Sequence, residues 1–182
     1  MELWEKTVES QRKFDGILLH LDVDTVALPD SHTAIREVVR HPGGVCVLPL
    51  HADGTVSVVR QFRYPYGEVV TELPAGKLEP GEDPFDAIRR ELSEETGYTA
   101  GEWHEMGLFY PTPGYTDERL HLYFARDLKP GATHLDADEF LEGDRVSLEE
   151  LLDQVMRGEI KDGKSIALIL KVKRFLELEQ SR

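Results

Sequence analysis

The chain contains a single cysteine, Cys46, among its 182 residues. A single cysteine excludes a disulfide framework within the chain. Because it stands in the apolar run 45–48, we interpret it as a buried strand residue rather than a reactive thiol. Long apolar runs are also missing, since none approaches the ~18 residues of a membrane span. The opening residues, MELWEKTVES, do not have the pattern of a signal peptide. We therefore expect a cytoplasmic protein with no membrane partner.

Positive charge is scarce in this chain, which has 21 Lys and Arg residues against 35 Asp and Glu residues and a net charge of −14. Binding to nucleic acid needs a basic footprint, so we expect no nucleic-acid partner. A phosphate substrate would also be repelled, unless bound divalent cations invert the local field. The content of 40% hydrophobic and 31% charged residues is typical of a folded chain, and the length fits one domain with an appendage.

Residues 84–96 have the start and stop signals of a helix. Asp83 can accept hydrogen bonds from the first free backbone N–H groups, and Pro84 suits the first helical position. Gly97 suits a left-handed C-cap. Three apolar residues share one face through their three- and four-residue spacing: Phe85, Ile88 and Leu92.

Three glutamates follow the same helical spacing. Glu91 and Glu95 lie beside the apolar face, so we expect both at the seam where the helix meets the protein body, whereas Glu94 lies within reach of Arg90. Like charges near an apolar seam cost free energy unless something neutralises them. Carboxylate oxygens select Mg²⁺, Mn²⁺ or Ca²⁺ over zinc. The alternative, a solvated acidic helix face, would explain Glu94 but not the seam placement. We interpret the cluster as a site for divalent cations.

The stretch 76–98, GKLEPGEDPFDAIRRELSEETGY, resembles the Nudix box at every fixed position. The matching residues are Gly76, Glu82, Arg90, Glu91, Leu92, Glu94, Glu95, Gly97 and Tyr98. The resemblance implies an enzyme that hydrolyses a nucleoside diphosphate linked to another group. It also implies an α/β/α sandwich with a mixed sheet, in which the box forms a loop, a helix and a second loop. The interleaving of expected strands and helices independently indicates the α/β class.

Three flanking segments resemble the branch of the family that acts on ADP-ribose and nucleoside diphosphate sugars. They are RQFRYP at 60–65, ELPAG at 72–76 and PTPGYTDE at 111–118, in which Pro113 stands sixteen residues after Gly97. The branch implies release of a nucleoside monophosphate and a sugar phosphate. The alternatives are a Nudix hydrolase for GDP-mannose, oxidised nucleotides or dinucleoside polyphosphates, and a non-catalytic nucleotide-binding module.

The resemblance also implies a metal site. The carbonyl oxygen of Ala75 and the carboxylates of Glu91 and Glu95 are the expected ligands, with Glu94 as a water-mediated or third-ion ligand. Two or more Mg²⁺ ions are expected, with Mn²⁺ as the alternative cation. Arg90 is grouped, with Glu94, among the catalytic residues of the box.

A second acidic segment, 136–142, resembles the catalytic loop of the branch. Glu139 or Glu142 is expected to act as the general base, and Glu142 also as an added metal ligand. A mobile loop would let such a base approach only when substrate is bound. The alternative is a solvated acidic loop.

Five further residues are implied as substrate contacts. Arg63 is expected to contact the diphosphate, because a guanidinium fork matches paired phosphate oxygens. Glu72 is expected either to accept from the nucleobase or to steady Arg63. Gly114 and Glu118 belong to a loop expected at the distal ribose or sugar, and Arg36 is expected to reach the substrate from a partner subunit. An ordinary surface ion pair is the alternative for Arg63.

We expect two parts in the chain. Residues 1–40 would form an N-terminal β extension exchanged across a homodimer, and residues 41–182 the Nudix domain. The expected strands are 17–28 (a strand or hairpin arm), 34–39, 45–50, 56–62, 69–73, 103–110, 120–125 and 140–146, and the expected helices are 84–96, 147–158 and 165–178.

Overall fold

A computed structural model describes residues 3–134 and 140–181, which fall into two compact units. Unit 1 extends to Gly43 and also includes Tyr110–Arg119, and unit 2 consists of Gly44–Phe109 and Leu120–Arg182. The first division therefore falls three residues after the boundary at residue 40 expected from the sequence. The segment 110–119 belongs with the N-terminal strands, because Val39 N donates to Tyr115 O at 2.7 Å and Asp117 N to Val39 O at 3.2 Å.

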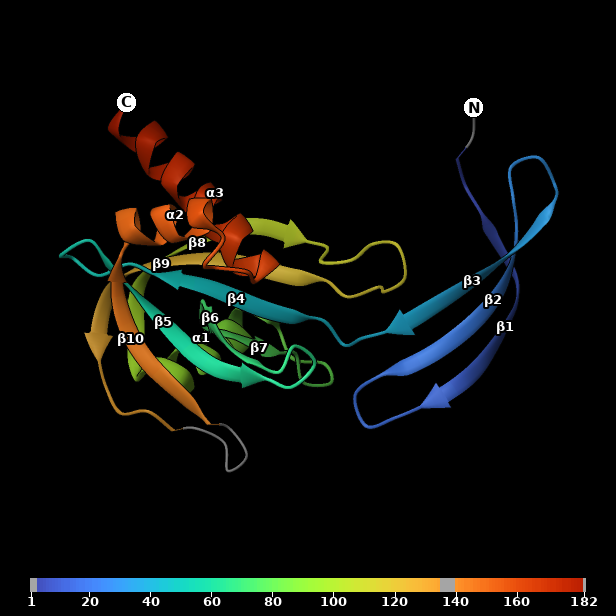
Figure 1. The fold of residues 1–182 in the computed structure, drawn as a ribbon, viewed down its shortest axis with the longest axis horizontal. Helices are drawn as coiled ribbons and strands as arrows, with labels where there is room; N and C mark the ends of the chain where they lie inside the picture. The colour runs from blue at the N-terminus through green and yellow to red at the C-terminus, as the bar shows by residue number, and fades with distance from the viewer. Residues whose placement is uncertain (1–2, 135–139, 182) are drawn as a thin grey trace. The chain divides into compact units, whose positions relative to one another are not determined.

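Unit 1 is built on an antiparallel sheet of three strands in the order β1-β2-β3, drawn in blue shades in Figure 1. The strands are β1 (Lys6–Asp15), β2 (His20–Ala27) and β3 (Thr33–Arg40). Asp22 and Asp24 of β2 are buried, and Arg40 donates to both carboxylates at 3.0 and 3.1 Å. The range 17–28 expected from the sequence contains β2, but β1 was missed because all its residues are exposed and mostly polar.

Unit 2 contains two sheets. The mixed sheet has the order β7-β4-β9-β8, in which β4 and β9 are parallel and the other pairs antiparallel. Its strands are β4 (Gly44–Pro49), β7 (Ala75–Lys77), β8 (Tyr98–Phe109) and β9 (Leu120–Pro130). The second sheet is antiparallel in the order β10-β5-β6, with β5 (Thr55–Arg63), β6 (Glu68–Glu72) and β10 (Leu141–Ser147).

Strand β4 lies at the centre of unit 2 and is buried along its whole length. Its side chains alternate between two cores, as strand geometry requires. Val45 and Val47 pack with Ile88 of helix α1 (Pro84–Thr96), whereas Cys46 and Leu48 pack with helices α2 (Leu148–Arg157) and α3 (Gly163–Gln180). Figure 1 shows α1 on one side of the mixed sheet and α2 and α3 on the other. This arrangement is the expected α/β/α sandwich.

Helices α1 and α2 confirm the caps that the sequence predicts. Helix α1 has the predicted bounds, and α2 begins after Ser147, whose hydroxyl accepts from Glu150 N at 3.1 Å. Helix α3 begins two residues earlier than expected, because Asp162 acts as its N-cap and accepts from Ser165 N at 3.0 Å. Cys46 is fully buried, and burial raises the pKa of its thiol well above the usual value, as expected of an inert residue. None of the described helices is long and apolar enough to cross a membrane.

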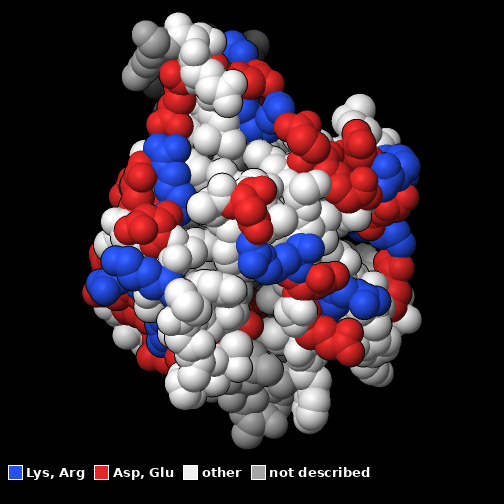
Figure 2. Space-filling model, turned by 90° about the vertical axis from the view of Figure 1, so that its left-hand side faces the viewer, with Lys and Arg blue, Asp and Glu red and all other residues white. Residues whose placement is uncertain are grey.

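Side chains of both signs are mixed on one face of the molecule. Figure 2 shows this face, on which lysine and arginine side chains are interspersed among the acids.

We predict that Leu168→Ala lowers the free energy of unfolding by about 2–5 kcal/mol, because it opens a cavity in the core between α3 and the mixed sheet. Leu168 is fully buried, whereas Leu170, two residues further along the same helix, is 44% exposed. Leu170→Ala is therefore the matched control, with an expected loss below about 1 kcal/mol. Urea unfolding measures both changes. Equal losses in the two variants would contradict the described packing of α3.

Candidate active site

Helix α1 presents the carboxylates of the site. Its start is fixed by Asp83, whose side chain accepts from Phe85 N at 2.9 Å, and its end by Gly97, whose φ of 72° is left-handed. Between these caps Glu91 and Glu95 are 7% and 4% exposed. They lie at the apolar seam, as their spacing predicts.

Both carboxylates meet strand β7. Ala75 N donates to Glu95 Oε2 at 3.0 Å. A Cβ placed on Gly76 would lie 1.8 Å from Glu91 Oε1, so only glycine leaves room for this carboxylate against the strand. The structure thus brings together Ala75, Glu91 and Glu95, the three residues that the sequence analysis names as metal ligands.

Arg90 forms hydrogen bonds with three acids of the box. Its Nε and Nη2 donate to the two carboxylate oxygens of Glu82 at 3.0 and 3.1 Å. Its Nη1 donates to Glu91 at 2.8 Å and to Glu94 at 2.9 Å, so the predicted reach from Arg90 to Glu94 is confirmed. The hydrogen bond with Glu82, reinforced by the other two acids, raises the pKa of Arg90 above its ordinary value. Arg90 therefore holds the preceding turn to the helix and partly neutralises its acids.

The donors around α1 fit a hard divalent cation. They are carboxylate and backbone carbonyl oxygens, the ligands that Mg²⁺ and Mn²⁺ prefer. Within the described ranges, no three His, Cys, Asp or Glu side chains are already gathered as a group that could hold a metal ion. Arg90 is the cation recorded against the three acids Glu82, Glu91 and Glu94. A divalent cation would offset the remaining negative charge.

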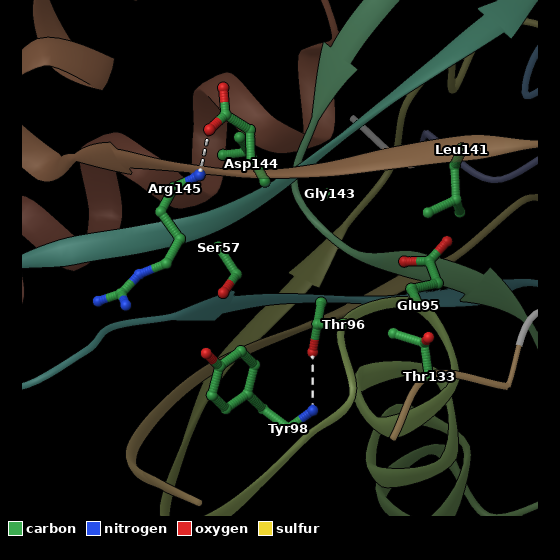
Figure 3. Close-up of a pocket in the computed structure, with 10 residues that line it drawn as sticks. Ser57, Glu95, Thr96, Tyr98, Thr133, Leu141, Gly143, Asp144 and Arg145 are labelled. Carbon is green, nitrogen blue, oxygen red and sulfur yellow. Dashed lines mark hydrogen bonds between the residues drawn. The ribbon is translucent and has the colours of Figure 1, made fainter. Parts of the chain in front are cut away.

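Glu95 also lines a pocket of about 530 Å³. In Figure 3, Glu95 and Leu141 lie toward one side of this pocket and Arg145, Ser57 and Tyr98 toward the other. The described residues that line it are Ser57, Val58, Glu95, Thr96, Tyr98, Thr133, Leu141, Gly143, Asp144 and Arg145. These residues come from helix α1, from separate strands and from a loop, and they form no local motif, so sequence reasoning did not group them.

A second charged cluster lies where β6 ends. Glu72 is 2% exposed, and its carboxylate accepts from Arg63 Nε at 2.6 Å and from Arg63 Nη2 at 2.7 Å. Lys164 Nζ donates to the same carboxylate at 2.6 Å. Burial alone would raise the pKa of Glu72, but the hydrogen bonds and charges of Arg63 and Lys164 outweigh it and hold this pKa below its usual value. Of the two roles expected for Glu72, the structure shows the contact that steadies Arg63.

Sequence reasoning missed Lys164. A signal for it exists, because a lysine in the first turn of a helix opposes the helix dipole. Such a residue is unfavourable unless acids are nearby, and Lys164 lies 3.0 Å from Asp162 as well as contacting Glu72. The Glu72 contact spans 92 residues of sequence. Local patterns could therefore flag the residue but could not name its partner.

The structure describes one of the two acids that the sequence analysis proposes as the general base. Glu139 lies outside the described residues. Glu142 pairs in register with Arg60 of β5, its side chain is 81% exposed, and its carboxylate lies 3.6 Å from Arg60 Nη1. Within β10 the pocket that Glu95 lines is bordered by Leu141, Gly143, Asp144 and Arg145, and Glu142 is not among its described lining residues. In the described structure Glu142 therefore lies beside Arg60 and does not line the pocket that Glu95 lines.

The remaining expected substrate contacts belong to unit 1. Arg36 donates to Glu5 at 2.9 and 2.6 Å. The carboxylate of Glu118 lies 3.6 Å from His41 Nδ1. A Cβ on Gly114 would meet nothing within 4 Å, so local packing does not require a glycine there.

Comparison with known proteins places these features in a family. A model of the NUDIX domain matches residues 40–169. The chain is 40% identical over 181 residues to the ADP-ribose pyrophosphatase of Bacillus subtilis (strain 168), covering 98% of this chain and 96% of that protein. It is 38% identical over 179 residues to the methanol dehydrogenase activator of Bacillus methanolicus, covering 97% and 95%.

A solved structure agrees on the fold. The crystal structure of an ADP compounds hydrolase superposes with a TM-score of 0.86 at 18% identity, covering 98% of both chains. The matched range 40–169 spans the box, helix α1 and both sheets of unit 2. Because the sequence motif, the family model and relatives of nearly full length agree, the protein belongs to the Nudix family.

Proposed function

We propose that this protein hydrolyses the diphosphate linkage of ADP-ribose, or of a closely related nucleoside diphosphate sugar, in a reaction that depends on Mg²⁺. The observation that carries the proposal is the convergence of Glu91 and Glu95 on Ala75 and Gly76 of strand β7. The identity of 40% with a relative named ADP-ribose pyrophosphatase supports the choice of substrate. The products would be AMP and ribose 5-phosphate.

The carboxylates of Glu91 and Glu95 and the carbonyl oxygen of Ala75 would hold the metal, with Glu94 as a further ligand when two or more ions bind. When bound, Mg²⁺ would neutralise diphosphate charge and lower the pKa of a coordinated water. Arg90 keeps Glu91 and Glu94 in position from its anchor on Glu82.

Arg63 is the proposed diphosphate contact. Glu72 holds its guanidinium along the edge formed by Nε and Nη2. The side chain of Arg63 is 40% exposed, so it can reach a ligand without leaving Glu72. A charged fork held in this way offers hydrogen bonds of the strength that phosphate oxygens favour.

We place the general base at Glu139. Of the two acids that the sequence offers, Glu142 is disfavoured because it pairs with Arg60 and is not among the described residues that line the pocket of Glu95. A base must come within hydrogen-bond reach of the proton it removes, directly or through one water.

Unit 1 completes the proposal. We place Arg36, Gly114 and Glu118 at the substrate in a cytoplasmic homodimer that exchanges the N-terminal extension. The exposed apolar side chains of this extension, which include Trp4, Val8 and Phe14, support an interface between copies.

The substrate is tested by phosphate release from ADP-ribose, ADP-glucose and GDP-mannose with Mg²⁺ and a coupling phosphatase. We expect kcat/KM for ADP-ribose to exceed that for GDP-mannose at least about tenfold, a typical span for pocket discrimination. A preference for GDP-mannose would instead assign the enzyme to another substrate class within the Nudix family. Inactivity on every substrate would favour the non-catalytic binding module.

The metal site is tested with Glu91→Gln and Glu95→Gln. Glutamine can keep the hydrogen bond from Ala75 N at position 95, so that change removes charge with little loss of shape. We expect turnover at saturating Mg²⁺ to fall at least about 100-fold, because a metal ion contributes several kcal/mol at the transition state. Glu149→Gln is the control, since Glu149 is an exposed acid of α2 paired with Lys173.

Thermal unfolding gives an independent measurement of the same site. Mg²⁺ should raise the Tm of the wild type and of Glu149→Gln but have a much smaller effect on Glu95→Gln, because a ligand stabilises only the state that binds it. Wild-type turnover in Glu91→Gln or Glu95→Gln would refute the assignment of the ligands.

The base is tested with Glu139→Gln and Glu142→Gln. Loss of a general base costs about 10²–10⁴-fold in rate, so we expect kcat to fall within that range for Glu139→Gln. Glu142→Gln should change kcat by less than about threefold, as expected of an exposed surface pair. Steady-state kinetics at saturating Mg²⁺ measures both. The reverse order of effects would make Glu142 the base.

A further inference from the structure

The first turn of helix α3 forms hydrogen bonds with the end of strand β6. Lys164 Nζ donates to Glu72 Oε2 at 2.6 Å, and Ser165 Oγ accepts from the next backbone amide, Leu73 N, at 2.8 Å. Asp162 Oδ2 accepts from Ser165 N and from Ser165 Oγ at 3.0 and 2.5 Å, which fixes the turn itself. Leu73 stands two residues before Ala75, a proposed metal ligand. The C-terminal helix therefore supports the proposed site although its residues lie far from the box in sequence.

The four charges in this cluster alternate in sign. Arg63 meets Glu72, Glu72 meets Lys164, and Lys164 meets Asp162. The side chains of Glu72 and Lys164 are only 3% and 12% exposed, and burying such charges costs several kcal/mol unless each is paired. Burial alone would lower the pKa of Lys164, but the charges of Asp162 and Glu72 hold it above the usual value. Lys164 therefore stays a cation.

The cluster leaves one edge of Arg63 available. Glu72 uses Nε and Nη2 of the guanidinium, whereas Nη1 has no hydrogen-bond partner in the described part of the chain. The third hydrogen bond to Glu72, from Lys164, limits rotation of the carboxylate. A rotation of the Glu72 carboxylate would also turn the guanidinium of Arg63 that is bound to it. The ammonium group of Lys164, by holding Glu72, therefore restricts the direction in which Arg63 Nη1 points.

We infer that Lys164 is a positioning residue of the reaction: it locks Glu72, and Glu72 aims the Nη1 edge of Arg63 at the diphosphate. The inference rests on the proposed function, because it needs a diphosphate ligand. A purely structural role, in which Lys164 only fastens α3 to β6, makes a different prediction, since it would change stability without acting through Arg63.

The chain offers a matched control. Lys161 donates from just before α3 to Glu68 Oε2 at 2.7 Å, at the other end of the same strand β6. Its side chain is 59% exposed and has no contact with Glu72 or Arg63 in the described part of the chain. Lys161→Met therefore removes a lysine that also joins this region to β6, without touching the cluster.

The test compares Lys164→Met with Lys161→Met in steady-state hydrolysis of ADP-ribose at saturating Mg²⁺. We expect Lys164→Met to raise KM about tenfold and to change kcat less than about threefold, the pattern of lost uniform binding. Lys161→Met should match the wild type. If Lys164→Met does not fold, Lys164→Gln, which keeps a shorter donor without the charge, replaces it and should show the same rise in KM.

The same change is then made in an Arg63→Met background. If Lys164 acts through Arg63, the rise in KM disappears there, because the two residues are coupled. A rise of equal size with and without Arg63, or a lower Tm with unchanged KM, would overturn the inference and leave Lys164 as a structural anchor.

Failure of the proposed function is distinguishable. A wild type that hydrolyses ADP-ribose while Lys164→Met behaves like Lys161→Met refutes the inference alone. A wild type that neither hydrolyses ADP-ribose nor binds its α,β-methylene analogue in calorimetry refutes the proposed function, and the inference falls with it.

Discussion

Two carboxylates, Glu91 and Glu95, lie buried where helix α1 meets strand β7, and the surrounding structure is arranged to tolerate them. Removing a carboxylate from water costs several kcal/mol unless it is paired. The apolar side chains of Ile88 and Leu92 pack this side of the helix into the core, and both acids are buried beside them. Arg90, the amide of Ala75 and the missing side chain of Gly76 make the burial tolerable.

The two charged clusters of unit 2 differ in their balance, and this difference separates their roles. The cluster on α1 sets Arg90 against three acids, so it is suited to accept a cation. The cluster on β6 alternates two cations with two anions and has little need of a further charge. A buried network whose positive and negative charges are equal in number is rigid and has little tendency to bind a further ion. It therefore suits the orientation of Arg63 toward a ligand better than the capture of a metal.

Local signals were sufficient for α1, because caps and apolar spacing act within a few residues, and Asp83, Gly97 and Ile88 all lie where those signals predict. They failed for β1, whose exposed polar residues have no burial pattern to read. The direction of Glu142 depends on its register with Arg60, and a shift of one residue would reverse it. The contact of Lys164 with Glu72 depends on how α3 packs, which no window of sequence records.

The box itself cannot carry the choice of substrate. The recorded hydrogen bonds of the Arg90 side chain all go to acids of the same box, and Glu95 accepts from the backbone of β7. Such contacts would position the proposed metal ion and its water, which every diphosphate substrate needs alike. Discrimination requires groups that pair with one substrate and stay unpaired with another. Arg63, as the proposed diphosphate contact, also serves every such substrate, so selectivity must come from groups that meet the nucleobase or the distal sugar rather than from the proposed metal ligands of α1.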